Sequence, residues 1–119
     1  MATSTTGYSA GDRPSGGAHE MGAGYYSVTL AAGLTLTMAY QNMLRIDPGG
    51  SARIVVLPAE EGNAGAWFEV LNTADAAEAI TINDDAAGLV VALAQNEKVR
   101  VVCDGTAWTH MGIQTIALS

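Results

Sequence analysis

The sequence predicts an all-β protein, a small antiparallel sandwich or barrel-like roll of about seven to eight strands with an extended N-terminal arm. From residue 25 onward, short runs rich in Val, Ile and Thr alternate with clusters of Gly, Pro, Asn and Asp. This pattern is typical of strands joined by turns rather than of alternating strands and helices. An Asp-Gly pair at 104–105 lies between two β-rich runs and predicts a hairpin. We therefore expect a β domain over residues 25–119.

Residues 1–24 differ in composition from the rest of the chain. Gly, Ser, Thr and Ala dominate them, Pro14 interrupts them, and no apolar residue recurs at a regular period. Such a composition predicts either a disordered terminus or an extended arm that becomes ordered across a neighbouring subunit. In the second case the tyrosines Tyr8, Tyr25 and Tyr26 would anchor the arm.

The first three predicted strands are separated by clear turn signals. Residues 34–40 alternate apolar and small polar side chains, which is typical of a strand with one buried face. A second strand over 43–47 ends in the Asp-Pro-Gly-Gly sequence at 47–50, a strong turn. A third strand over 53–57 is a continuous β-branched run that stops at Pro58, and we expect it in the centre of a sheet.

The next strands follow a polar loop. Residues 66–72 form a predicted strand with apolar side chains on both faces, and residues 79–83 and 89–93 are two more β-rich runs. Alanine is dense over 73–79, where a helix competes, but so short a window is not a stable helix by itself. We predict a loop there, with at most one helical turn.

The Asp-Gly pair fits a two-residue type I′ turn, which would place Cys103 opposite Thr106. Lys98 and Arg100 then point away from the buried side of the hairpin. Residues 113–118 are apolar enough to form a last strand or to dock on a partner. The predicted core face of the hairpin consists of Val99, Val101, Cys103, Trp108 and His110.

Charge and hydropathy exclude several functions. Five Lys and Arg residues against twelve Asp and Glu give a formal net charge of −7, and no basic run occurs. Nucleic acids and anionic membranes are bound through clustered cations, so we expect neither as a partner. Apolar stretches such as 89–94 have the length of a strand, not the ~20 residues of a membrane span. The first residues also lack the basic and apolar regions of a secretory signal.

Candidate catalytic and metal-ligating residues are sparse, and we predict neither enzymatic activity nor a cofactor. His19 and His110 stand in no metal-binding spacing. Cys103 is the only cysteine and precedes a carboxylate, a setting that disfavours a reactive thiolate. We interpret His110 as a strand or contact residue and Cys103 as a buried strand residue.

Acidic pairs offer two weaker alternatives. Asp84 and Asp85, with Asn83, could supply oxygen ligands to calcium, but the spaced acidic ladder of a calcium loop is missing, and we prefer a solvated turn. The neighbouring carboxylates at 60–61 point apart on a loop and lack general-acid geometry. Glycine clusters in the arm lack the Lys-Ser/Thr of a phosphate loop.

The composition favours a protein that packs against other protein. Hydrophobic residues make up 49% of the chain, but 21 of them are alanines, so the core is thin for one small domain. Charged residues are only 14%, which is low for a free monomer. We therefore expect a homo-oligomer or docking on a larger body.

Three motifs carry a family resemblance. They are Ile54-Val-Val-Leu-Pro58, Trp67-Phe-Glu-Val-Leu-Asn72 and Cys103-Asp-Gly-Thr-Ala-Trp108. Their order over residues 52–111 resembles small β domains of tailed-bacteriophage virion proteins, above all capsid decoration (cement) and head-fibre proteins. The resemblance implies a structural protein, made in the host cytoplasm and placed on the outer capsid surface of the virion. It also implies a homotrimer that binds the major capsid protein and stabilises the head.

Aromatic and apolar residues outside the predicted core are candidate contacts with a sister subunit or with the capsid: Tyr8, Tyr25, Tyr26, Trp67, Ile116 and Leu118. The alternative function is a receptor- or glycan-binding module of a phage fibre or tail, in which Trp67, Tyr40 or Trp108 would stack on sugar rings. A small barrel enzyme is a third interpretation, which the missing histidine cluster disfavours.

Overall fold

The structure is a computed structural model that describes residues 24–116. Within this range the chain forms nine strands and no helix, so the all-β prediction is confirmed, with more strands than expected. The predicted arm, apart from Gly24, lies outside the described residues, as do Tyr8, His19 and Leu118. No helix among residues 24–116 is long and apolar enough to cross a membrane. The strands are β1 (Tyr25–Thr29), β2 (Leu34–Thr35), β3 (Met43–Asp47), β4 (Arg53–Val56), β5 (Trp67–Asn72), β6 (Ile80–Asn83), β7 (Leu89–Leu93), β8 (Glu97–Cys103) and β9 (Trp108–Thr115).

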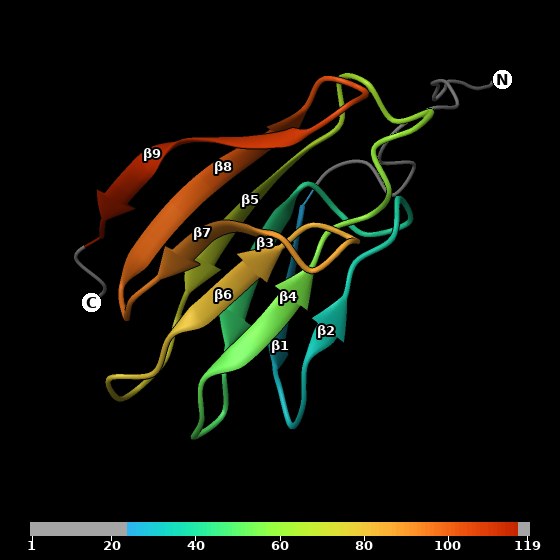
Figure 1. The fold of residues 1–119 in the computed structure, drawn as a ribbon. Helices are drawn as coiled ribbons and strands as arrows, with labels where there is room; N and C mark the ends of the chain where they lie inside the picture. Colours follow the sequence, from blue (N-terminus) through green and yellow to red (C-terminus); the bar gives the residue numbers. More distant parts are fainter. Residues whose placement is uncertain (1–23, 117–119) are drawn as a thin grey trace, which may run out of the picture.

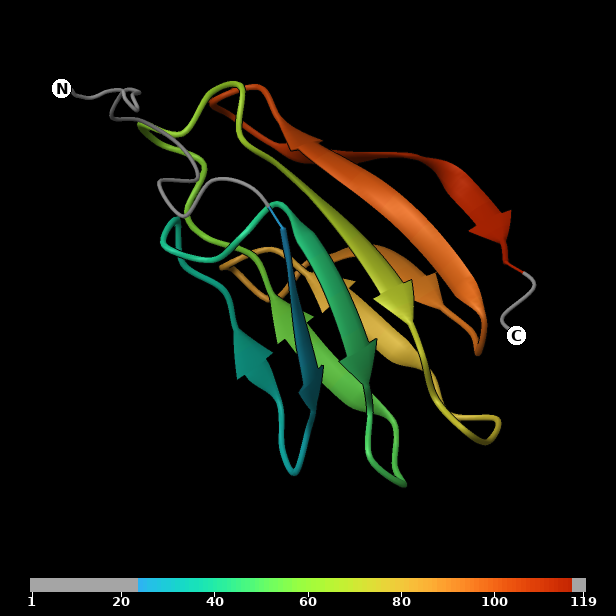
Figure 2. The same ribbon diagram turned by 180° about the vertical axis from the view of Figure 1, so that it is seen from behind.

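The strands form two sheets, β1-β3-β5-β8-β9 and β2-β4-β6-β7 (Figures 1 and 2). Through β6 the chain changes sheet after every strand, and the neighbours within each sheet run parallel. Only the β5–β8, β8–β9 and β6–β7 pairs are antiparallel among the described strands. The antiparallel prediction is therefore wrong for the first six strands. Parallel neighbours need a crossover connection, and here each crossover is a strand of the other sheet. Each sheet keeps two edge strands, so neither closes into a barrel.

Both sheets direct side chains into one shared hydrophobic core. In β5 the side chains alternate, with Phe68 and Val70 buried and Trp67 and Glu69 only half-buried on the opposite face. Phe68 packs against Trp108, with ring centroids 6.0 Å apart. β4 lies between β2 and β6, the central place that its β-branched run predicts.

The strand predicted over 34–40 is mostly irregular. Only Leu34 and Thr35 form a ladder, and the chain turns after Leu36, where the Tyr40 N–H donates to the Thr37 carbonyl at 3.2 Å. The predicted face is nevertheless correct in part, because Leu36 is buried and Tyr40 packs against the core. Periodicity therefore identifies the buried face but not the end of the ladder.

The β8–β9 hairpin has a longer turn than predicted. Cys103 lies opposite Trp108 rather than Thr106, so the connection spans residues 104–107. The Asp104 Oδ1 accepts the N–H groups of Thr106 and Ala107, each at 2.8 Å. These hydrogen bonds, led by that from Ala107, hold the pKa of the Asp104 carboxyl below its ordinary value. The side chain of Asp104 thus closes a wider turn than the two-residue one expected from the Asp-Gly pair.

The shifted register keeps the hairpin face but exposes its end. Val99, Val101, Cys103 and Trp108 are buried, as predicted, whereas His110 is exposed, so the prediction is wrong for this residue. β9 is an edge strand, and every residue from Thr109 to Thr115 is exposed. The ladder also shifts between Val99 and Val101, opposite Gly112, which adopts a φ of 101°. Such a bulge bends the strand, and glycine adopts this backbone conformation without steric cost.

Candidate interaction surface

One face of the five-stranded sheet points away from the core and carries aromatic, apolar and basic side chains together. Strand register defines its rows. Tyr25, Met43, Glu69 and Arg100 lie side by side across four strands. The next row contains Arg45, Leu71, Lys98 and Gln114. We call this surface the outer face, and its main residues are Tyr25, Met43, Arg45, Trp67, Glu69, Leu71, Lys98, Arg100, Met111, Gln114 and Ile116.

Three of the six predicted contact residues meet on the outer face. Tyr25 is 55% exposed and lines the same hollow as Ile116, and Trp67 lies on the neighbouring part of the sheet. Tyr26 points the other way and meets the Tyr40 ring edge-on at 5.4 Å. Tyr8 and Leu118 lie outside the described residues. Predictions drawn from separate parts of the chain thus converge on one surface.

Basic residues concentrate on this face. Three of the four Lys and Arg residues between 24 and 116 lie here, namely Arg45, Lys98 and Arg100. As predicted, Lys98 and Arg100 point away from the core. By contrast, seven carboxylates occupy loops and turns elsewhere: Glu60, Glu61, Asp75, Glu78, Asp84, Asp85 and Asp104. The outer face is therefore a basic patch on an acidic molecule, a distribution that sequence order alone does not reveal.

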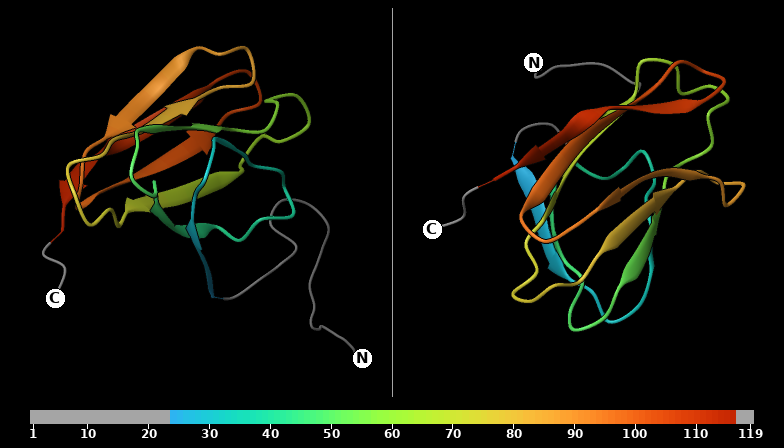
Figure 3. Two further views of the ribbon diagram at one scale, coloured as in Figure 1. Left: turned by 90° about the horizontal axis from the view of Figure 1, so that it is seen from below. Right: turned by 60° about the vertical axis from the view of Figure 1, so that its left-hand side comes forward.

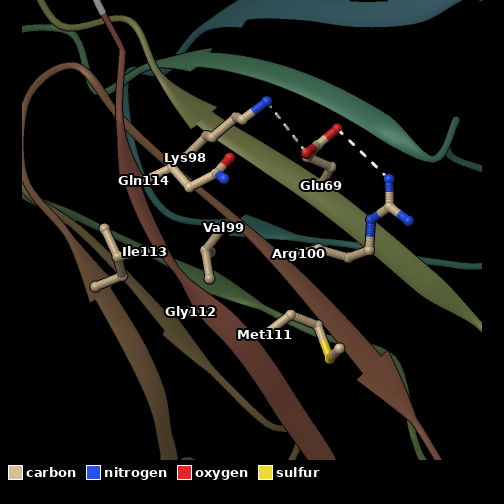
Figure 4. A pocket seen from close by; sticks show the side chains of 8 residues that line it. All are labelled: Glu69, Lys98, Val99, Arg100, Met111, Gly112, Ile113 and Gln114. Carbon is tan, nitrogen blue, oxygen red and sulfur yellow. Dashed lines mark ion pairs between the residues drawn. The ribbon is translucent and has the colours of Figure 1, made fainter.

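Glu69 is the carboxylate at the centre of the basic patch (Figure 4). Its oxygens lie 3.6 Å from the Lys98 Nζ and 3.9 Å from the Arg100 Nη2. The Arg100 guanidinium also covers the Trp67 ring at 4.2 Å from the centroid, and that of Arg45 lies 5.5 Å from the Tyr25 ring centroid. Ion pairs between partly exposed surface side chains contribute about 1 kcal/mol or less, so they orient the side chains more than they stabilise the fold.

Two open hollows lie next to each other on the outer face. The first has a volume of about 360 Å³ and lies over β8 and β9 beside Met111 and Gly112 (Figure 4). The second, of about 300 Å³, is lined mainly by apolar groups, including Met43 and Leu71. Glu69 and Lys98 line both. Small-molecule sites enclose most of their ligand, whereas these open hollows suit side chains of a macromolecular partner.

Within the Asp84-Asp85 pair, the Asp84 carboxylate holds a turn. The Asp84 Oδ1 accepts the N–H groups of Ala86 at 3.0 Å and of Gly88 at 2.7 Å, as a turn requires. Residues far apart in sequence form a separate cluster, in which carboxylate oxygens of Asp47, Asp75 and Glu78 lie within 4.8 Å of one another. Two of these also accept backbone N–H groups, from Gly49 to Asp47 and from Gly50 to Glu78.

The aromatic residues proposed as sugar platforms are largely covered. Trp108 is buried, and its Nε1 donates to the Pro58 carbonyl at 2.9 Å. Tyr40 is half-buried against Tyr26, and Trp67 is half-buried beneath Arg100. The two tryptophans therefore occupy different environments.

Fluorescence quenching of single-tryptophan variants should separate these environments. Trp67→Phe leaves Trp108, whose emission is expected to resist acrylamide because the indole is enclosed in the core. Trp108→Phe leaves Trp67 at the surface, and its emission should be quenched more strongly. Thermal melting would verify that both variants are folded. Equal quenching of the two folded variants would contradict these placements.

Comparison of this chain with protein-family models, with curated proteins and with solved structures finds no match in any of the three.

Proposed function

We propose that this chain is a structural virion protein, a capsid decoration (cement) subunit that binds the outer surface of a phage head and stabilises it as a homotrimer. The observation that carries the proposal is the outer face, on which Tyr25, Trp67 and Ile116 gather with most of the described basic residues. Interfaces are enriched in aromatic residues, methionine and arginine, and this face contains all three kinds. Its partners would be sister subunits and the major capsid protein.

The fold is consistent with this role at a finer level. In the proposed subunit, the two sheets are the layers of a sandwich, and residues 1–24 form an arm that reaches a sister subunit or the capsid. A thin core gains stability when the outer face is covered by another protein. The net charge of −7 favours a position on the exterior of the head, away from packaged DNA.

The proposed role is not catalytic and uses no cofactor. His110 is exposed on an edge strand, and its Nδ1 accepts the N–H of Gly112 at 3.2 Å. The Cys103 sulfur is buried, 3.7 Å from the Glu60 carbonyl oxygen. Both arrangements support the structural interpretation of these residues.

Light scattering coupled to size exclusion tests the oligomer, and head binding tests the role. We expect a mass three times the 12.2 kDa of one chain, and saturable binding to expanded heads of the phage that encodes this protein, stripped of the native copies. Heads carrying the bound protein should resist heat better than bare heads. A monomer that binds neither expanded nor immature heads would end the proposal.

The receptor- or glycan-binding alternative has less support. Of its three platforms, Trp108 is buried, and Tyr40 and Trp67 are half-buried against other side chains. Stacking on a sugar requires an open ring face. A shift of Trp67 emission on addition of an oligosaccharide, with no binding to heads, would favour this alternative over the capsid role.

A further inference from the structure

We infer that copies of this chain associate head to tail, with the acidic β6–β7 turn of one copy inserted into the basic, apolar hollow on the outer face of the next. This contact rests on the self-assembly required by the proposed function. It adds to that function the two surfaces that meet, and each has its own structural support.

The β6–β7 turn, residues 84–88, has the properties of an inserting element. It projects from the body of the molecule (Figure 3, right). It is held in shape from within, because the Asp84 N–H donates to the Gly88 carbonyl at 2.8 Å and the Asp84 carboxylate caps the turn. Asp85 is exposed at the tip, and Leu89, at the base of the turn, is 68% exposed. A preformed turn loses little conformational entropy on binding.

The receiving hollow has complementary chemistry. Its volume is about 300 Å³, and apolar groups of Met43, Leu71 and Ile116 line it. Arg45 and Lys98 stand at the same hollow with one carboxylate, that of Glu69, which pairs with Lys98 at 3.6 Å, so the hollow carries one net positive charge. Leu89 therefore matches the apolar lining, and Asp85 matches the cations. Opposite potentials of this kind speed association and fix its orientation.

Other acidic segments fit less well. The carboxylates at 60–61 and at Asp104 have no strongly exposed large apolar residue beside them among the described residues. The carboxylates of Asp75 and Glu78 lie close to that of Asp47, and the Glu78 carboxylate also accepts the Gly50 N–H. Within residues 24–116, only the β6–β7 turn combines free negative charge with an exposed leucine.

The contact must join different copies. The outer face points away from the core and hence from the four-stranded sheet, to which β6 and β7 belong. A turn of that sheet cannot reach the outer face of its own chain. Two different surfaces then meet at each contact, and a contact of this kind closes into a ring when its rotation permits, as in a trimer.

Charge reversal tests the contact on the full chain. Asp85→Lys and Arg45→Glu should each weaken self-association about tenfold, since like charges then face each other. Glu61→Lys makes the same change of charge as Asp85→Lys on another exposed loop and serves as its control, with wild-type association expected. Sedimentation across a concentration series measures association, and thermal melting verifies folding.

Complementation gives the decisive comparison. The double variant D85K/R45E should recover most of the lost association, and an equal mixture of the two single variants should associate more strongly than either alone. If the wild-type protein is oligomeric and neither single variant differs from Glu61→Lys, this contact is wrong while self-assembly stands. If the wild-type protein is a monomer throughout the series, the self-assembly of the proposed function fails as well.

Discussion

Replacing Asn72 by aspartate is expected to lower the free energy of unfolding by about 3–5 kcal/mol. Asn72 is the buried polar side chain among residues 24–116, with 0% exposure at the end of β5. Its Nδ2 donates to the carbonyls of Glu78 at 2.9 Å and Leu93 at 3.3 Å, and its Oδ1 accepts the Ala74 N–H at 2.9 Å. Aspartate preserves the shape but directs a carboxylate oxygen at two carbonyl oxygens, without water to solvate the charge.

Urea unfolding of Asn72→Asp at about pH 7 measures the loss. Burial raises the pKa of a carboxyl group, so the new side chain favours its neutral form in the folded state. The loss relative to wild type should therefore be smaller at about pH 4, near the ordinary aspartate pKa of about 3.9. Asn63→Asp is the matched control, because the Asn63 Nδ2 makes one exposed hydrogen bond, to Ala59. We expect it to cost under about 1 kcal/mol, and equal losses at both positions would contradict the burial argument.

Substitution of Gly49 by alanine should cost about 3 kcal/mol or more, since two penalties coincide. Gly49 has a φ of 78°, and an added Cβ would lie 2.1 Å from the Leu30 carbonyl oxygen. Leu30 cannot easily move away, because its N–H donates to the Asp47 carbonyl at 2.8 Å. The methyl group would thus separate the end of β1 from the turn that follows β3.

The adjacent glycine isolates the steric part of this effect. Gly50 has a φ of 97°, but a Cβ added at this residue would have nothing within 4 Å of it. Gly50→Ala therefore carries only the conformational penalty, about 1–2 kcal/mol. Denaturant unfolding of both variants under one set of conditions gives the comparison. If Gly50→Ala is as destabilising as Gly49→Ala, the close contact with Leu30 does not control stability.

The sequence predicts local features of this fold well. Alternation in β5 places Phe68 inward, and the β-branched run before Pro58 indicates the central position of β4. These features depend on the side chains of one strand and its immediate turns, so a window of a few residues contains the necessary information. The same holds for Lys98 and Arg100, whose outward direction follows from the alternation of side chains between the two faces along β8.

Neighbour relations between strands could not be predicted in this way. Nothing in residues 43–47 alone indicates that β3 pairs with β1 and β5 instead of with the strands on either side of it in sequence. The hairpin register depends on one side chain, that of Asp104, which accepts two N–H groups and widens the turn. His110 is exposed because no part of the described chain covers the residues of β9 after Trp108. That depends on how all the strands are arranged, not on the sequence of β9 itself.

The candidate surface was predictable only in fragments. Tyr25, Trp67 and Ile116 attract attention as apolar residues outside the expected core. Arg45 completes the basic patch, but it joins Leu71 and Lys98 only through the register of three strands. Charge clustering on a sheet face is thus a product of topology, and the net charge of −7 conceals it.

The alternation of the first six strands between the two sheets affects how such a chain can change in length. Paired residues in this region lie 18 to 27 positions apart in sequence, because the chain passes through a strand of the other sheet before it returns to pair with the preceding strand of the same sheet. β1 and β2 form the first two-strand unit, one strand in each sheet, and both are edge strands. Duplicating or deleting one such two-strand unit at this end would add one strand to each sheet or remove one from each, while the β8–β9 hairpin at the other end stayed intact. This architecture can therefore grow by whole two-strand units, which an interleaved antiparallel fold cannot do.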